Sequence, residues 1–218
     1  MIKKYRFITF TVMILSFLYV YPESFKLIKN KNDFGGKTYE VSYTKGDKFY
    51  DQLQITRAIL HYDKNEELAI VEYYFTREFV AKKNYEKKIE YYGDKKKVNK
   101  AEYFYTKKFA DEKGTYKVVD ILDSNGEVAQ VLFFYTDKFV SKYGFENSIM
   151  YLAKGYITKI EYYYNDEFAK KYGYKIREDK YVYDSYGNKK VTVAIFYDEE
   201  GKEVNRIENP TNYIEPER

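Results

Sequence analysis

Few residues of this chain could carry acid–base chemistry or bind a metal ion. There is one histidine, His61, and no cysteine. A histidine-based catalytic triad would have to be built around His61, and neither a thiolate site nor a multi-histidine metal site can form. In AILHYD, His61 alternates with apolar residues. A packed histidine on a strand is far commoner than a tuned catalytic base, so we interpret His61 as a structural residue.

Paired carboxylates are the remaining candidates for catalysis, because glycoside hydrolysis needs only two acids at a set distance. Glu72, Glu102 and Glu161 occupy equivalent positions in repeated segments. An active site is normally unique, whereas a solvated strand position recurs in every repeat. We therefore predict a protein without catalytic activity, metal or cofactor.

The three glutamates belong to an internal repeat with a period of about 30 residues. Each copy has an aromatic strand end, a Thr or Asn that can cap a helix, a short amphipathic segment and a terminal Gly or Asn. Helical turns are therefore predicted at 76–84, 106–114, 136–144 and 165–173. A helix this short must be docked on something. The four central rings predicted to fasten the helical turns to the sheet are Phe79, Phe109, Phe139 and Phe168.

The segments between the helical turns alternate as β-hairpins do. The chain contains 29 Tyr and 16 Phe, and aromatic and β-branched residues favour strands. We predict a mainly β fold, with α+β as the alternative class, for a single repeat domain over 37–208. Antiparallel hairpins joined by short helical turns would form one long twisted sheet. Closure into a barrel with the helical turns along one rim is the alternative architecture.

The second strand of each hairpin has an apolar face and a mixed face, which carries one aromatic ring per strand among polar residues. In the favoured interpretation the helical Phe of each repeat folds back onto this row of rings and covers it. In the other interpretation the row is exposed and stacks on sugars or binds an extended partner. The row comprises Tyr74, Phe104, Phe134, Tyr163 and Phe196.

A local excess of lysine surrounds Lys95, Lys96 and Lys97. We interpret this segment as a solvated hairpin tip whose charge keeps strand edges from aggregating. The functional alternative is a contact for an anionic partner.

The N-terminus has the order of a secretory signal, in which basic residues precede the uncharged apolar run 7–21. We predict a signal peptide over 1–24, or an uncleaved N-terminal anchor that would be the only membrane contact. The protein would then be exported to the periplasm or cell surface of a bacterium. Two of the three prolines lie in the tail 209–218, which is predicted to be irregular.

The charge balance argues against a nucleic-acid partner. The chain has a net charge of +4, which falls to +2 when residues 1–24 are removed. A nucleic-acid-binding protein is expected to carry a larger basic excess or a concentrated basic stripe.

The motif Y-D-x-x-G occurs at Tyr183 to Gly187 and again at Tyr197 to Gly201. In these turns the chain resembles the YD or Rhs-type repeats of bacterial surface proteins, and the series of hairpins is similar to MORN-type repeat proteins. The resemblance covers about a third of the chain, and the helical turns depart from both families. It implies a structural or binding repeat.

These features predict a cell-envelope protein that serves as a structural or protein-interaction repeat. Its partner would be another envelope protein or a second copy of the chain. The alternative is a module that binds a glycan or cell-wall polymer through the aromatic row.

Overall fold

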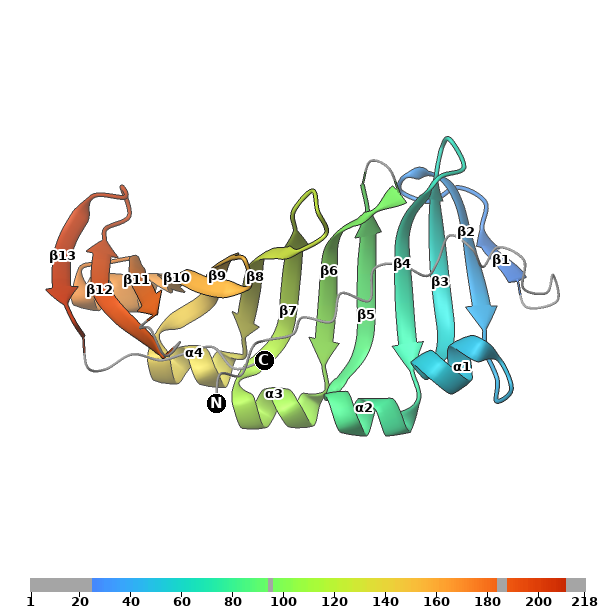
Figure 1. Cartoon of the computed structure of the whole chain (residues 1–218), viewed down its shortest axis with the longest axis horizontal. Coiled ribbons are helices and arrows are strands. Elements are labelled where there is room, and N and C mark those ends of the chain that lie inside the picture. Colours follow the sequence, from blue (N-terminus) through green and yellow to red (C-terminus); the bar gives the residue numbers. More distant parts are fainter. Residues whose placement is uncertain (1–24, 94–95, 184–187, 211–218) are drawn as a thin grey trace. The chain divides into compact units, whose positions relative to one another are not determined.

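The structure is a computed structural model that describes residues 25–93, 96–183 and 188–210. The predicted signal segment, Lys95 and the tail from residue 211 onward lie outside the described residues. Thirteen strands follow their order along the chain in one open sheet (Figure 1). Short helices connect successive hairpins. This confirms the predicted mainly β fold of antiparallel hairpins joined by helical turns.

The described residues divide into two compact units. The N-terminal unit comprises residues 25–106 together with Leu122–Gly126. Its strands are β1 (Phe25–Lys29), β2 (Gly35–Ser42), β3 (Ile55–Asp63), β4 (Leu68–Phe75), β5 (Tyr85–Tyr92) and β6 (Val98–Tyr105). Its helices are α1 (Lys48–Leu53) and α2 (Arg77–Lys83). The sequence pattern predicted neither β1 nor α1.

The C-terminal unit comprises residues 107–121 and 127–210 among those described. It contains most of β7 (Thr115–Leu122), then β8 (Val128–Tyr135), β9 (Phe145–Ala153), β10 (Tyr156–Tyr164), β11 (Ile176–Tyr183), β12 (Lys189–Tyr197) and β13 (Glu203–Glu208). Its helices are α3 (Lys107–Lys113), α4 (Asp137–Tyr143) and α5 (Asp166–Tyr172).

Three helices, α2, α4 and α5, begin and end at the residue types that the repeat predicts. The side-chain oxygens of Thr76, Thr136 and Asn165 accept hydrogen bonds from the backbone amides of the central Phe residues of α2, α4 and α5. A capping oxygen satisfies one of the amides that a first helical turn leaves unpaired. The same three helices end at residues with left-handed backbone conformation, namely Asn84, Gly144 and Gly173.

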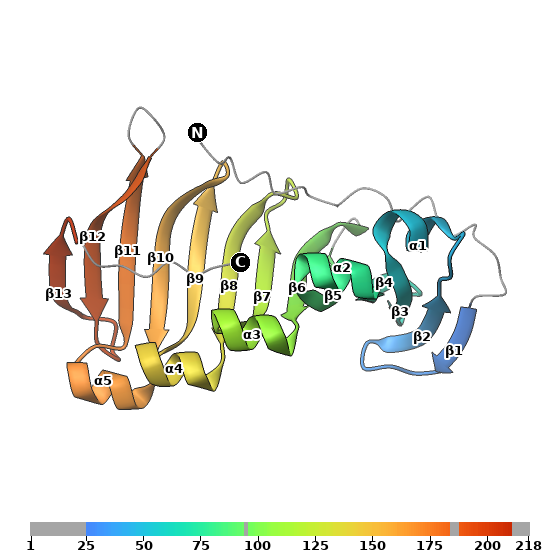
Figure 2. The ribbon, with the colours of Figure 1, turned by 90° about the horizontal axis from the view of Figure 1, so that it is seen from below.

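Within the C-terminal unit, each helix docks against the end of the preceding one. The Thr136 amide donates to the Gly114 carbonyl at 2.7 Å, and the Asn165 amide donates to the Gly144 carbonyl at 2.8 Å. A Cβ atom at Gly144 would overlap the ring of Phe168. Figure 2 shows α3, α4 and α5 in series at the same end of the strands. Gly144 is therefore required for the close approach of a ring as well as for its backbone conformation.

The central rings of three helices stack on the last aromatic residue of the preceding strand. The pairs have interplanar angles of 13 or 14° and centroid distances of 4.3 to 4.5 Å, and they are Phe75 with Phe79, Tyr135 with Phe139, and Tyr164 with Phe168. Because alternate residues of a strand share a face, these contacts define a helix-bearing face in each unit. This face holds much of the core, including Val71, Val131, Phe133, Ile160 and Tyr162.

Candidate functional site

The opposite side, which we call the helix-free face, carries the predicted aromatic row. In the N-terminal unit, Tyr74 lies opposite Arg57 and Lys87 on the neighbouring strands, and Lys87 lies opposite Phe104. The Arg57 guanidinium carbon is 4.0 Å from the centre of the Tyr74 ring. Lys87 Nζ lies 5.5 Å from that ring and 5.6 Å from the Phe104 ring. Cations and aromatic rings thus alternate across β3 to β6, at distances typical of cation–π contacts.

The row continues in a different form in the C-terminal unit. Phe134 and Tyr163 both lie opposite Asn147. Lys117 Nζ is 4.2 Å from the centre of the Phe134 ring. The Tyr163 hydroxyl donates to the Glu161 carboxylate at 2.7 Å. Both rings could be identified from the sequence, whereas the contact of Lys117 with Phe134 could not, because Lys117 comes from another strand.

The prediction that the helical Phe residues cover this row is wrong for α2, α4 and α5. Their rings stack on Phe75, Tyr135 and Tyr164, which belong to the helix-bearing face. The fourth predicted staple, Phe109, is half-buried. The capping residue directly follows the last residue of the strand, so the helical Phe meets the ring of that last residue. The ring of the predicted row lies one residue earlier and points to the opposite face.

Phe196 does not belong to the row. It lies opposite Arg177, which lies opposite Tyr162, so all three share the helix-bearing face. Phe196 is 6% exposed, and its ring packs edge-on against Tyr174. Tyr197 takes the expected position on the helix-free face. The prediction was off by one residue. Which residues of β12 lie on each face is fixed by its pairing with β11, and no capped helix follows β12 to mark this alternation in the sequence.

Glu72 is the centre of a polar cluster on the helix-free face of the N-terminal unit. Its carboxylate lies 2.9 Å from His61 Nε2 and 2.5 Å from Lys87 Nζ, and it accepts a hydrogen bond from the Tyr74 hydroxyl at 3.2 Å. His61 Nδ1 is 3.2 Å from the Thr38 hydroxyl. Burial raises the pKa of Glu72, but the hydrogen bonds from Lys87 and His61 outweigh burial, so the net pKa is lowered.

Glu161 is the centre of the equivalent cluster in the C-terminal unit, with different partners. It accepts hydrogen bonds from the Tyr151 hydroxyl at 2.8 Å and from Lys159 Nζ at 2.6 Å, as well as from Tyr163. Burial raises the pKa of Glu161, but these hydrogen bonds lower it by more than burial raises it, so the net pKa is below the ordinary value. Lys159 also contacts Glu178 at 3.0 Å.

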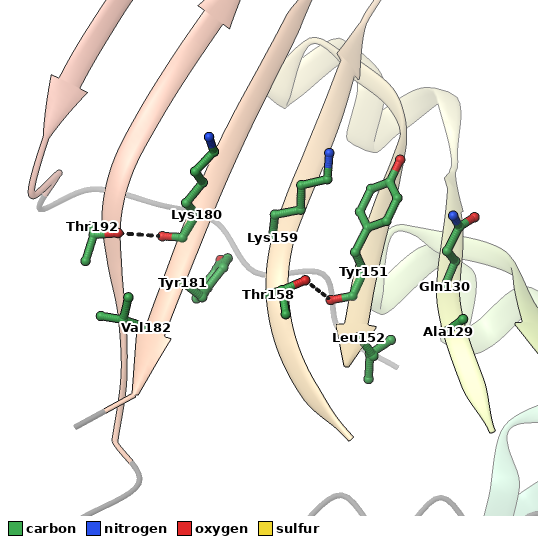
Figure 3. A pocket seen from close by; sticks show the side chains of 10 residues that line it. All are labelled: Ala129, Gln130, Tyr151, Leu152, Thr158, Lys159, Lys180, Tyr181, Val182 and Thr192. Atoms are coloured by element: carbon green, nitrogen blue, oxygen red, sulfur yellow. Dashed lines mark hydrogen bonds between the residues drawn. The ribbon is translucent and has the colours of Figure 1, made fainter. Parts of the chain in front are cut away.

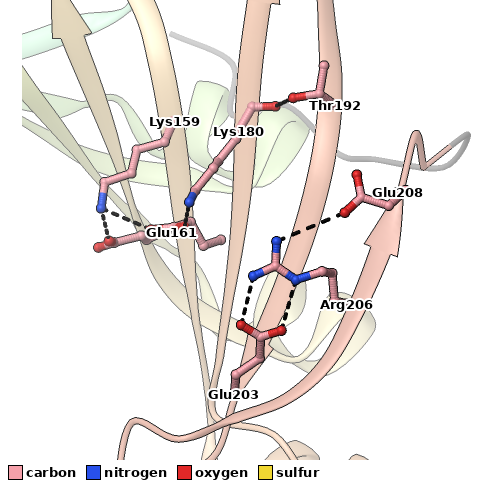
Figure 4. A network of polar contacts seen from close by, with 8 residues as sticks. Lys159, Glu161, Lys180, Thr192, Glu203, Arg206 and Glu208 are labelled. Carbon is pink, nitrogen blue, oxygen red and sulfur yellow. Dashed lines mark hydrogen bonds and ion pairs between the residues drawn. The ribbon is translucent and has the colours of Figure 1, made fainter.

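Further charged pairs lie on β11 and β13. Lys180 Nζ lies 3.3 Å from Glu178, and Figure 4 shows a separate group in which Arg206 lies between Glu203 and Glu208. Arg206 makes two hydrogen bonds of 2.9 Å to Glu203 and lies 4.0 Å from Glu208. The charges of this face are thus largely paired.

Glu102 forms a third acidic centre, 3.0 Å from Lys100 Nζ. Lys100 Nζ also lies 3.5 Å from the centre of the Tyr91 ring. Burial and the neighbouring Glu102 carboxylate raise the pKa of Tyr91 to about 12. A general acid needs a raised carboxyl pKa, so the lowered pKa values of Glu72 and Glu161 suit ion pairing rather than proton donation.

A shallow hollow of about 620 Å³ lies beside the second cluster (Figure 3). Lys159, Lys180 and Tyr151 contribute to its lining, while Thr158 and Thr192 donate hydrogen bonds to backbone carbonyls there. Both lysines are already engaged by carboxylates. The hollow therefore extends the mixed polar surface and is not a separate cationic site.

The predicted lysine patch is exposed where it is described. Lys96 and Lys97 are both exposed, and Lys96 Nζ lies 4.0 Å from a carboxylate oxygen of Glu67. Neither Lys96 nor Lys97 belongs to the Glu72 or Glu161 cluster described above.

A comparison with protein-family models and with curated proteins found no match to this chain. Within residues 25–93, 96–183 and 188–210, no helix is long and apolar enough to cross a membrane. No group of three or more metal-ligating side chains is gathered in this same part of the chain.

Proposed function

We propose that the chain is an exported, non-catalytic repeat protein of the bacterial cell envelope that binds another envelope protein through its helix-free face. The observation that carries this proposal is the arrangement of Tyr74 between Arg57 and Lys87, on the face opposite the stacked ring of α2. An aromatic ring flanked by cations offers apolar area and charge at one place. Interfaces between proteins are enriched in Tyr, Phe and Arg for this reason.

The charge pattern favours a protein partner. Glu72 and Glu161 are each held by a cation and a tyrosine hydroxyl, so acids and bases lie a few ångströms apart on the same face. A protein surface can present the complementary alternation of charges, and this complementarity gives specificity more than affinity. The proposal of export depends on the basic and apolar order of residues 1–24.

The test is a pull-down from native cells with the full chain and with the double variant Arg57→Ala/Tyr74→Ala. We expect the variant to lose the captured partner at least tenfold, since truncated hot-spot residues typically cost more than about 1.4 kcal/mol. Tyr172→Ala is the matched control, because Tyr172 is half-exposed and lies on α5. Equal recovery with all three proteins would contradict the proposal.

A cell-wall polymer is the second candidate partner, because the helical rings of α2, α4 and α5 stack on the other face and not on the row. Aromatic faces at strand spacing would stack on successive sugars. The chain has no Trp, which is the residue with the largest stacking face. We expect Tyr163→Ala to reduce co-sedimentation with purified cell wall if this candidate is correct. Unchanged co-sedimentation would reject the polymer and leave the protein partner.

The absence of catalysis is tested with the paired variant Glu102→Gln/Glu161→Gln. If the proposal is correct, this variant and the natural chain give the same result in every assay of cell-wall glycan hydrolysis. A hydrolytic activity that is present in the natural chain and lost in this variant would show that the carboxylates are catalytic.

A further inference from the structure

The first and last strands of the sheet, β1 and β13, each pair with a neighbour on one side only among the described residues. Such an edge presents a row of backbone N–H and C=O groups that can pair with another strand. Natural sheets usually protect these edges with charge, proline or a covering element. β1 and β13 follow this rule only in part, because apolar side chains are exposed beside their charged residues.

Exposed apolar residues concentrate at these two edges. Nine large hydrophobic side chains are exposed in the described part of the chain, and five of them lie here. Leu27 and Ile28 of β1 are 45% and 44% exposed, Phe34 beside β1 is 43% exposed, and Val204 and Ile207 of β13 are 48% and 43% exposed. The charges of these strands therefore protect the edges only in part, and the exposed apolar side chains offer area that another strand can cover.

Each edge strand combines a regular segment with a bulge. The register of β1 shifts at Ile28 and that of β13 shifts at Val204, so these two residues are the extra residues of the bulges. Regular pairing covers Phe25–Leu27 and Asn205–Glu208. The available seam is therefore short, at three or four residue pairs, and we expect association that depends on protein concentration.

The two edges carry opposite charges. β1 contains two lysines, Lys26 and Lys29, and no acid, whereas β13 contains Glu203 and Glu208 with a single cation, Arg206. Opposite charges across paired strands stabilise the pair, and like charges destabilise it. Pairing β1 with β13 brings a strand of net charge +2 beside one of net charge −1, whereas pairing either strand with its own copy brings together strands of like net charge.

The placement of the side chains agrees with the charge pattern. Lys26 lies opposite Glu40, on the helix-free face, while Leu27 lies opposite Tyr39 on the helix-bearing face. On β13, Ile207 lies opposite Ala194, which shares the face of Phe196. Because β1 and β13 run in the same direction in the sheet, a seam that keeps both faces continuous pairs them in parallel. It gathers the lysines of β1 and the glutamates of β13 on one face, and Leu27 and Ile207 on the other.

We propose that β13 of one copy pairs with β1 of a second copy, so that the sheet continues from one chain into the next. This is a head-to-tail contact, which forms a ring if the rotation between copies closes and an open filament if it does not. The backbone hydrogen bonds of an added strand supply affinity, and the charged residues select the orientation.

The first test is disulfide trapping in cells that produce the full chain. The natural chain has no cysteine, so every disulfide must involve an introduced residue. Co-production of Leu27→Cys and Ile207→Cys chains should give a disulfide-linked dimer under mild oxidant, and each variant alone should give at least tenfold less. Tyr116→Cys is the control, because Tyr116 is exposed on β7 away from both edges.

The second test reverses the charges. Lys26→Glu/Lys29→Glu and Glu203→Lys/Glu208→Lys should each weaken association about tenfold, measured by sedimentation across a range of concentrations. The chain that carries all four changes should regain association, since its two edges are again complementary. An unchanged melting temperature of the dissociated variants shows that each has folded.

Three results would overturn the proposal. Cross-linking of Ile207→Cys chains with one another would show that β13 pairs with its own copy. A monomer at all concentrations, with no cross-link, would show that the edges are covered within one chain. Failure of the fourfold variant to regain association would show that charge complementarity does not pair β1 with β13. None of these results bears on the helix-free face, because Arg57 and Tyr74 take no part in the seam.

Discussion

The two faces of the sheet follow the repeat to different degrees. On the helix-bearing face, the stacked pairs of α2, α4 and α5 have nearly the same geometry. On the helix-free face, Glu72 is held by His61 and Lys87, whereas Glu161 is held by Tyr151 and Lys159. A contact that docks a short helix must recur in every copy, while a surface that binds one partner can differ between copies. The comparison separates structural residues from candidate binding residues.

The largest expected difference between the faces is at adjacent positions of β8. Phe133 is 1% exposed on the helix-bearing face, whereas Phe134 is half-buried on the other face. Phe133→Ala should lower the free energy of unfolding by about 3 to 5 kcal/mol, and Phe134→Ala by about 1 kcal/mol. Chemical denaturation of both variants measures the difference. Equal losses would show that the two faces contribute equally to stability.

The stacked ring of α4 should also contribute to stability. Phe139 contacts Tyr135, Tyr143 and Phe145 but is only half-buried. Phe139→Ala should therefore cost about 2 kcal/mol, less than the loss for a fully buried ring. The melting temperature of the variant should fall. At temperatures below that value, the folded variant should still capture the partner in a pull-down. Loss of binding without loss of stability would move Phe139 to the binding surface.

Two glycines separate backbone strain from ring packing. Gly144 and Gly173 both end helices with positive φ, of 85° and 78°. An added Cβ meets the Phe168 ring at Gly144 and open space at Gly173. Gly173→Ala should cost about 1 kcal/mol from backbone strain alone, and Gly144→Ala should cost about 1 to 3 kcal/mol more because the ring must move. Equal costs in denaturation would show that the helices do not need this close approach.

The smallest expected effect is the acid sensitivity of the helix-free face. The folded-state pKa values of Glu72 and Glu161 lie below their ordinary value of 4.5. Their ion pairs therefore contribute stability that is fully present above that value and is lost as the pH falls through the lowered pKa. Glu161→Gln should lower stability at pH 7 by about 1 kcal/mol, and the difference from the natural chain should shrink below pH 4.

Asp111→Asn is the matched control for that measurement. Asp111 forms an exposed pair with Lys107 on α3, and exposed pairs contribute little to stability. The free energy of unfolding of the Asp111→Asn variant should equal that of the natural chain at every pH. A loss as large as that of Glu161→Gln would show that the polar cluster has no special role.

The helical turns could be predicted from the sequence because their signals are local. A cap such as Thr136 acts on an amide three residues away, and Gly144 ends the helix within the same segment. The predicted turn at 136–144 therefore coincides with α4 and its caps. By contrast, α1 begins at Asp47, whose side chain makes no capping hydrogen bond, and ends at Gln54. The repeat signature is weak there, so α1 was missed.

The helix-free face was only partly predictable. Alternation along single strands placed Tyr74, Phe104, Phe134 and Tyr163 correctly on one face. It could not identify Arg57, Lys87 or Lys117 as the cations over these rings. It also placed Phe196 on the wrong face, because the alternation of β12 depends on how β11 pairs with both of its neighbours.

The amino-acid sequence by itself determined the repeat, the hairpins, the capped helices and the residue types available to each strand. The partners of each side chain were decided only in the tertiary structure. Caps and turns act over a few residues, whereas Glu72 meets His61 and Lys87 only through pairing with strands on both sides. A bulge or a shift of one residue in that pairing moves a side chain to the other face, as the position of Phe196 demonstrates.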